Sequence, residues 1–357
     1  MKFTYFYPMK ILTLFLTSLF IQLAAFAQTD LDIKIEQQPF DFSVFFIKQN
    51  GHQIKKQIVL INRPGYNKAD TSTIEDYDYQ GDMTLRILFS GGQRSSRTTF
   101  KTSKEKKVSN WRSDNIPERR VSLNATTFLT NGKPSWFINT DVNAKGDTVL
   151  RSLVKFNYDN NQQLLERTEQ LNGQISLKRK YTYENGNLKN FETKVAGSSG
   201  VIRHEYLYNE EKLPVKKTEV HTGPMGSATF RTTNYTYQNK RMAIERYSNI
   251  DGDKKDVEIK YVYDPKGRIS GFRATRDTLF RDVIFEYVGD RLKQIKSKGN
   301  TTIEFGRELR IIAPYTGKHE LFTYSREFEY DKKDNLIRDT QFLNGNKIMQ
   351  MDYQLIY

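Results

Sequence analysis

The sequence contains no cysteine among its 357 residues. Disulfides, thiolate metal sites, a cysteine nucleophile and a lipid attached to an N-terminal cysteine are therefore excluded. Histidine is also scarce, and the four copies are His52, His204, His221 and His319. Their spacing matches no metal-ligand pattern. We expect no bound metal, and a fold held together by burial and hydrogen bonding alone.

Sequence patterns of common enzymes are missing as well. No Gly-x-Ser-x-Gly, Walker or Gly-x-Gly-x-x-Gly pattern is present. The run "NIDGDKKD" at 249–256 has spaced aspartates but lacks the distal bidentate Glu of a calcium loop, so a hairpin turn is the simpler interpretation. Glu286 and Glu329 stand between aromatic residues and are expected on the outer faces of strands. The sequence predicts no catalytic residue, no cofactor and no enzymatic activity.

Only one long apolar run is present, at residues 11–26. It is shorter than the about 20 residues of a membrane span, it follows two lysines, and it ends in Ala-Phe-Ala, a small-x-small cleavage pattern. These features predict a signal peptide over residues 1–27 and a mature chain that begins at Gln28. An uncleaved membrane anchor is the alternative. We expect an exported protein, periplasmic, outer-surface or extracellular, with no transmembrane span after cleavage.

Positive charge exceeds negative charge along the chain. The formal charge is +14, and +12 remains when the two lysines of residues 1–27 are subtracted. A basic exported protein favours anionic partners such as a polysaccharide or another component of the cell envelope. Solubility alone is the other explanation of the charge. We predict no specific nucleic acid partner.

The basic segment 91–120 carries half of that excess, with nine Lys or Arg against three acids. The candidate binding residues for an anionic polymer are Lys104, Lys106, Lys107, Trp111 and Arg112. The cations would contact the anionic groups, and the Trp ring would stack on the polymer. A solvated charged loop is the alternative interpretation, because charge runs are usually solvated.

An aromatic-x-Tyr motif followed by a polar turn and a Leu, Ile or Met recurs through the second half of the chain. Its tyrosines, here called the anchors, are Tyr158, Tyr183, Tyr208, Tyr237, Tyr263, Tyr287 and Tyr330, and Tyr357 offers a terminal copy. Successive anchors are 24 to 29 residues apart, except for the 43 residues that separate the last two. A fixed period of this length indicates a repeat architecture.

One repeat can be interpreted as a pair of antiparallel strands. Aromatic-x-Tyr places two rings on one face of a strand because side chains alternate. The four residues 264–267, Asp-Pro-Lys-Gly, are turn formers, and a second turn such as "LNGQ" at 171–174 closes a unit of about 25 residues. A single hairpin is marginal in water, but stacked units let the tyrosines pair across strands. The anchors are therefore expected to be structural.

The stretch "YVYDPKGRI" resembles the YD repeat of bacterial RHS and teneurin-type proteins. Tyr263, Asp264, Gly267, Arg268 and Ile269 match its core. Other units replace the Asp, with Glu184, Asn209, Gln238 or Val288 in its place. The resemblance covers about residues 150–357 and implies a stacked β-sheet at or outside the bacterial cell surface. Large members of this family wind such repeats into a shell around a toxin, and we expect the repeats here to be too few for a closed shell.

The residues before the repeats are also predicted to form strands. Asn50-Gly51 is a favoured hairpin turn within "FSVFFIKQNGHQIKKQIVLI". The stretch 77–89 resembles a degenerate unit, and Phe128 lies one period upstream of Tyr158. We therefore predict an N-terminal β region at 28–121 and hairpin repeats at 122–357.

These observations predict an all-β protein of stacked antiparallel hairpin repeats, forming an extended or wound sheet. The function that fits best is a binding or scaffold module of the cell envelope, for a glycan or another anionic polymer. One alternative is a polysaccharide- or peptidoglycan-active enzyme, since a fold does not fix a function. The other is a small outer-membrane β-barrel. The short apolar alternation, which lasts only two or three positions per strand, argues against this second alternative.

Overall fold

The fold was analysed in a computed structural model. It describes residues 54–65, 69–79, 82–90, 92–103, 108–115, 120–129, 133–224, 226–248, 256–300 and 321–357. The predicted signal peptide, the Asn50-Gly51 turn, the 249–256 run except its last residue, His52 and His319 lie outside the described residues. Every regular element in the described part is a β-strand, and the described chain has no helix long and apolar enough to cross a membrane.

The strands are β1 (Lys56–Asn62), β2 (Asp70–Tyr77), β3 (Met83–Ser90), β4 (Gln93–Ser103), β5 (Val108–Asn115), β6 (Arg120–Phe128), β7 (Pro134–Val142), β8 (Thr148–Tyr158), β9 (Leu164–Leu171), β10 (Gln174–Glu184), β11 (Asn187–Val195), β12 (Val201–Tyr208), β13 (Pro214–Gly223), β14 (Gly226–Gln238), β15 (Arg241–Tyr247), β16 (Val257–Tyr263), β17 (Ile269–Arg276), β18 (Leu279–Val288), β19 (Arg291–Gly299), β20 (Phe322–Tyr330), β21 (Leu336–Leu343) and β22 (Asn346–Ile356).

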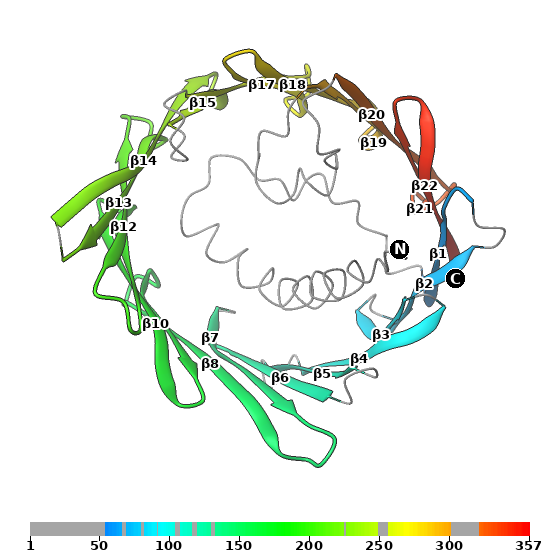
Figure 1. The fold of residues 1–357 in the computed structure, drawn as a ribbon, viewed down its shortest axis with the longest axis horizontal. Coiled ribbons are helices and arrows are strands. Elements are labelled where there is room, and N and C mark those ends of the chain that lie inside the picture. The colour runs from blue at the N-terminus through cyan, green and yellow to red at the C-terminus, as the bar shows by residue number, and fades with distance from the viewer. Residues whose placement is uncertain are drawn as a thin grey trace, which may run out of the picture.

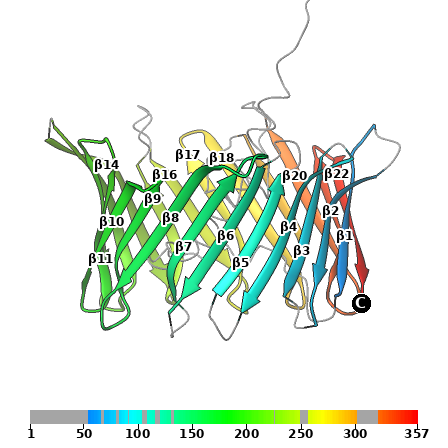
Figure 2. The same ribbon diagram turned by 90° about the horizontal axis from the view of Figure 1, so that it is seen from below.

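These strands form one closed ring, seen end-on in Figure 1 and from the side, with tilted strands, in Figure 2. Each strand pairs antiparallel with the next one, and β22 pairs with β1 from Lys56↔Ile356 to Asn62↔Gln350. The predicted all-β fold of antiparallel hairpins is confirmed. We expected too few repeats for a closed shell, but the whole chain does form a closed ring. The strands that precede the repeats complete it, and β1 pairs with β22. The sheet also continues across the predicted boundary between residues 121 and 122. This boundary lies inside β6, which pairs with β5 on one side and β7 on the other.

Side chains alternate between the two faces of this ring. In β16, Val257, Ile259 and Tyr261 are buried, whereas Lys260 and Val262 are exposed. A closed single-layer sheet crowds the side chains on its concave face and spreads those on its convex face. The buried set therefore lines the inside of the ring, and the exposed set faces outward.

The apolar part of the inner face forms two main clusters. The larger one extends over β15–β21 and includes Phe272, Phe285 and Ile295, and the smaller one extends over β8–β12 and includes Phe156 and Phe191. Both are built from repeat strands. Burial of these aromatic and aliphatic side chains is the main stabilisation of a single-layer wall that contains no disulfide.

A β-bulge accompanies every anchor. Val262 pairs with Gly271 but the next residue, Tyr263, pairs with Ile269, so one residue of β17 is extra. The same shift occurs just before the other six anchors. It also occurs before Phe128 and Tyr77, which supports their interpretation as degenerate anchors. Bulges bend a strand and increase its twist, and here they recur once per repeat.

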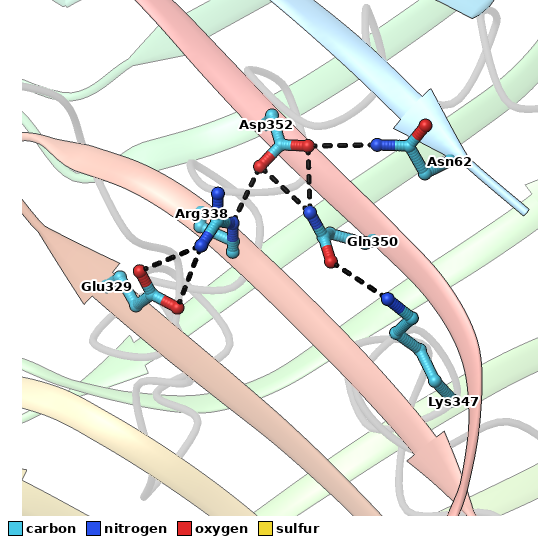
Figure 3. Close-up of polar contacts among 6 residues, drawn as sticks. All are labelled: Asn62, Glu329, Arg338, Lys347, Gln350 and Asp352. Atoms are coloured by element: carbon cyan, nitrogen blue, oxygen red, sulfur yellow. Dashed lines mark hydrogen bonds and ion pairs between the residues drawn. The ribbon is translucent and has the colours of Figure 1, made fainter. Parts of the chain in front are cut away.

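The closing seam carries a polar network on its outer face (Figure 3). Arg338 of β21 donates from Nε to Asp352 Oδ1 of β22 at 2.7 Å and lies 3.3 Å from Glu329 Oε2 of β20. Asn62 of β1 donates to Asp352 Oδ2 at 3.0 Å, and Gln350 donates to the same atom at 2.9 Å. Side chains of the first and last strands are therefore bonded directly across the seam.

Candidate functional site

The hydroxyl groups of the anchors are used within the fold. Tyr263 Oη donates to the carbonyl of Met242 at 2.7 Å, and Tyr287 Oη donates to that of Ile269 at 2.9 Å. Four further pairs are Tyr158 with Pro134, Tyr208 with Leu188, Tyr237 with Pro214 and Tyr330 with Leu292. Each acceptor lies at or next to the start of the strand after the preceding anchor. Through these six bonds the anchors join consecutive repeats.

Tyr357 does not follow this pattern. Its hydroxyl bonds the carboxylate of Asp331 and accepts a hydrogen bond from the Asn335 amide at 3.2 Å. The terminal copy of the motif is therefore tied to the side chains of the turn after Tyr330, not to a backbone carbonyl.

The arginine of the YD motif links its own turn to the next repeat. Arg268 donates from Nε to Asp264 Oδ2 at 2.8 Å and from Nη1 to the Gly289 carbonyl at 2.6 Å. Its guanidinium lies over the Tyr287 ring, 4.1 Å from the centroid. Arg241 over Tyr263 and Arg291 over Tyr330 repeat this stacking at 5.7 and 5.4 Å. The rings of Tyr263, Tyr287 and Tyr330 are therefore covered on one side by an arginine.

The residues predicted to bind an anionic polymer are only partly described. Lys104, Lys106 and Lys107 lie outside the described residues. Trp111 lies in β5, with Phe100 and Asn124 as its backbone partners on the two neighbouring strands. Arg112 is exposed and donates from Nε to Asp114 Oδ1 at 3.0 Å. The proposed grouping of these five residues stays a prediction.

A row of lysines on the outer face of β8–β11 was missed by sequence reasoning. Across these four strands the outward residues are Lys155, Thr168, Lys178 and Lys194, each the direct cross-strand partner of the next. Lys178 forms an ion pair with Glu166 at 2.9 Å, and Lys155 and Lys194 are exposed. The three lysines are 16 to 39 residues apart in sequence, so only the strand register brings them together.

Buried carboxylates on the inner face are tied to separate partners. Asp339 is fully buried and accepts from Arg326 Nε at 2.9 Å. Glu75 accepts from Arg86 Nε at 2.8 Å. Burial raises the pKa of Glu245, which accepts a hydrogen bond from Tyr261 Oη at 2.9 Å. These three carboxylates lie on β21, β2 and β15, and each is bonded to a different side chain.

Metal-binding geometry is likewise not found in the described part of the chain, where no group of three His, Asp or Glu side chains could hold an ion. His204 stacks on Phe191 with 4.4 Å between ring centroids. Burial lowers the pKa of His204 to about 3, and the positive charges of Lys217 and Arg179 act in the same direction. The imidazole is therefore a neutral part of the wall at physiological pH.

Comparisons with known proteins find no matching family model and no matching curated protein. Among solved structures, the chain is similar to the TcdB2–TccC3–Cdc42 complex at 13% identity and a TM-score of 0.37, and to a Photorhabdus luminescens Tc holotoxin pore at 12% and 0.37. Both likenesses cover 82% of this chain, but only 19% and 18% of the toxin chains. A porin-like protein from Bacteroides uniformis is similar at 9% identity and a TM-score of 0.28, over 85% of this chain and 98% of the other. The chain thus spans about a fifth of the toxin chains, and at such TM-scores none of these likenesses carries an argument about function.

Proposed function

We propose that this chain is an exported, non-catalytic ring scaffold of the bacterial envelope that binds an anionic polymer on its outer face. The observation that carries the proposal is the lysine row of Lys155, Lys178 and Lys194 on β8–β11. Like charges placed directly opposite each other on a sheet are destabilising. An anionic partner would supply the missing countercharge.

The geometry of the row suits a linear polymer. Neighbouring strands lie about 4.8 Å apart, so Lys178 and Lys194 stand one spacing apart and Lys155 about 10 Å further along the row. Among the described residues, neither Lys155 nor Lys194 has an ion-pair partner within 4.0 Å. Both ammonium groups therefore remain available to a ligand. The basic segment 91–120 is proposed as a second contact, through Lys104, Lys106, Lys107 and Arg112. Trp111 is left out of this contact, because its direct partner Asn124 lies on the inner face of the sheet.

The closed ring also favours a second candidate, an outer-membrane β-barrel, because closure removes the unpaired edges that a membrane does not tolerate. The outer face weighs against it. Lys178, Lys194 and Lys260 lie within strands, and Lys at the lipid-facing midplane of a barrel costs about 2–4 kcal/mol. Purified mature protein should stay monodisperse without detergent if it is the proposed scaffold, and should require detergent if it is a barrel.

Heparin resin eluted with a salt gradient tests the polymer-binding proposal. Each phosphate or sulfate contacted by a cation releases a counterion, so specific contacts produce a steep salt dependence. We expect the variant Lys155→Gln/Lys178→Gln/Lys194→Gln to elute at lower salt than the wild type. Circular dichroism should show that the ring remains folded, because none of the three side chains belongs to the inner clusters.

A matched control separates this site from net charge. The variant Lys260→Gln/Lys296→Gln/Lys298→Gln removes the same number of charges from the outer face of β16 and β19. If the two triple variants shift the elution salt concentration equally, heparin binding depends only on total charge. This result would overturn the proposed site. The variant Lys104→Gln/Lys106→Gln/Lys107→Gln tests the second contact in the same gradient.

A further inference from the structure

Polar side chains predominate on the inner face of β4–β7, where the register also places Phe100, Trp111 and Phe137. Two neighbouring rows cross these strands. One row is Thr98, Ser113, Ser122 and Asp141, and the other ends in Asn124 and Asn139, each residue being the direct cross-strand partner of the next. We call these six residues the inner polar strip. At about 4.8 Å per strand, the four-residue row extends roughly 14 Å around the wall.

Asn124 is the unexplained residue of this strip. It is 5% exposed, yet its Nδ2 and its Oδ1 both have no hydrogen-bond partner in the described structure. The neighbouring Asn139 Oδ1 is buried without a partner as well. Nearly all buried polar groups in native proteins are paired. An amide whose two N–H donors and carbonyl oxygen are all unpaired is therefore a group that awaits a ligand or an ordered water.

The other strip residues show that hydrogen bonding is possible here. Thr98 Oγ1 donates to Ser113 Oγ at 3.0 Å, and Ser122 Oγ donates to Asp141 Oδ1 at 2.6 Å. A carboxylate has about four acceptor positions, so Asp141 keeps capacity for further donors. Phe137, two residues before Asn139 on β7, lies on the same inner face and packs against the smaller cluster. The strip thus combines amides, hydroxyls and a carboxylate beside an aromatic ring.

We propose that the inner polar strip binds a neutral saccharide. Each sugar hydroxyl is both a donor and an acceptor, and an Asn amide can satisfy two adjacent hydroxyls at once, donating to one and accepting from the other. The flat carbon face of a sugar ring suits Phe137. An anionic ligand does not fit, because the one charged side chain of the strip is the carboxylate of Asp141. A peptide strand fits less well than a sugar, since in this closed ring β4–β7 are paired on both sides and offer no free sheet edge for strand addition.

This site is independent of the outer lysine row and lies on the opposite face. Titration calorimetry of the mature protein with neutral tetrasaccharides derived from a β-glucan, a mannan, a xylan and a dextran tests it. We expect at least one of them to bind. Asn124→Leu should weaken that binding at least about tenfold, because the free partners of the sugar hydroxyls are removed. Asn124→Ala provides the same test in a smaller side chain if Leu disturbs the wall.

The matched control is Asn234→Leu, the same substitution at an exposed position whose partners Lys216 and Arg246 belong to the outer face. It should bind the tetrasaccharide like the wild type, as should the Lys155/Lys178/Lys194 triple variant. Binding by none of the four tetrasaccharides overturns the proposal. Unchanged binding of the tetrasaccharide by both folded Asn124 variants also overturns it. The same holds if a peptide, and none of the sugars, binds the wild type and this binding is lost in Asn124→Leu.

Discussion

Each anchor tyrosine contributes a ring and a hydroxyl, and the two can be separated by substitution. The Tyr263 ring packs against the larger inner cluster, under Arg241, while its hydroxyl bonds the Met242 carbonyl of the preceding repeat. Burial of the ring stabilises one repeat against its neighbours in a non-directional way. The hydroxyl adds direction, because its acceptor lies at the start of β15, the strand before the one that carries Tyr263. The same bond to a backbone carbonyl recurs at Tyr158, Tyr208, Tyr237, Tyr287 and Tyr330, so it helps to set the register of consecutive repeats.

Truncating this residue in two steps should show both contributions. Tyr263→Phe removes the hydroxyl alone and should lower the free energy of unfolding by about 1 kcal/mol, the usual net value of a hydrogen bond. Tyr263→Ala also removes the ring and should cost about 3–5 kcal/mol. Urea denaturation followed by circular dichroism measures both.

The control for these variants is Tyr79→Ala, at a tyrosine that is 88% exposed in the turn after β2. It should change the stability by no more than about 0.5 kcal/mol. If Tyr263→Ala unfolds at the same urea concentration as the wild type, the anchors do not hold the repeats together, and their rings would have to be reconsidered as ligand contacts.

At the scale of one element, the turns after Tyr158, Tyr208, Tyr263 and Tyr330 share one shape, whereas the turns after the other three anchors are shorter. In the shared shape the residue four positions after the anchor has a positive φ, for example +82° at Gly267 and +59° at Lys212. Its N–H donates to the carbonyl of the residue after the anchor, at 2.8 Å for Asp264 and 2.9 Å for Asn209. Glycine adopts this conformation freely, whereas other L-residues are strained by about 1–2 kcal/mol. The glycine of the YD motif therefore avoids the backbone strain that Lys212 carries at the equivalent position.

Exchanging residues at this position should change stability in opposite directions. Lys212→Gly should raise the free energy of unfolding by about 0.5–1 kcal/mol, the relieved strain less the added flexibility of the unfolded chain. Gly267→Ala should lower it by at least about 1 kcal/mol, because an added Cβ also collides with the Arg241 guanidinium that covers Tyr263. Gly186→Ala, at φ +82° with open space around it, isolates the strain. If thermal melts give Gly267→Ala and Gly186→Ala the same loss of stability, then displacing the Arg241 guanidinium adds no destabilisation of its own.

Sequence periodicity predicted these turns and strand pairs because the anchors, the turn formers and the alternation are all local. The bulge before each anchor was not predicted. One extra residue, such as Ser270 between the partners of Val262 and Tyr263, leaves the period of about 25 residues unchanged. The inner polar strip escaped prediction for a related reason, since Asn124 and Asn139 are ordinary strand residues until the register places them side by side.

At the scale of the whole molecule, closure depends on a pairing between chain segments almost 300 residues apart. Strand β1 has no anchor motif, and nothing local in "KQIVLIN" specifies β22 as its partner. Non-local pairing of this kind cannot be deduced from periodicity. The outer lysine row has the same origin, since the basic run at 91–120 is visible in the sequence whereas Lys155 and Lys194 come together only in the folded sheet.

A chain without cysteine allows closure to be tested with a single introduced disulfide. Ile58 of β1 and Gln354 of β22 are direct cross-strand partners on the outer face. Antiparallel partners have Cα atoms about 4.5–5.5 Å apart, which lies within the range of about 4.4–6.8 Å that a disulfide spans. Ile58→Cys/Gln354→Cys should therefore oxidise readily, migrate faster than its reduced form on a denaturing gel, and gain up to roughly 5–6 kcal/mol from the long loop that it closes.

The control pair moves one cysteine to the next strand. Ile74 of β2 is the partner of Ile58 on its other side, so Ile74→Cys/Gln354→Cys places the cysteines two strand spacings apart, about 9–10 Å. A disulfide cannot bridge more than about 7 Å without backbone movement, and this pair should stay reduced under the same conditions. Slow or absent oxidation of the Ile58/Gln354 pair, or equal oxidation of both pairs, would mean that β1 and β22 are not neighbours in solution and that the sheet is open at this seam.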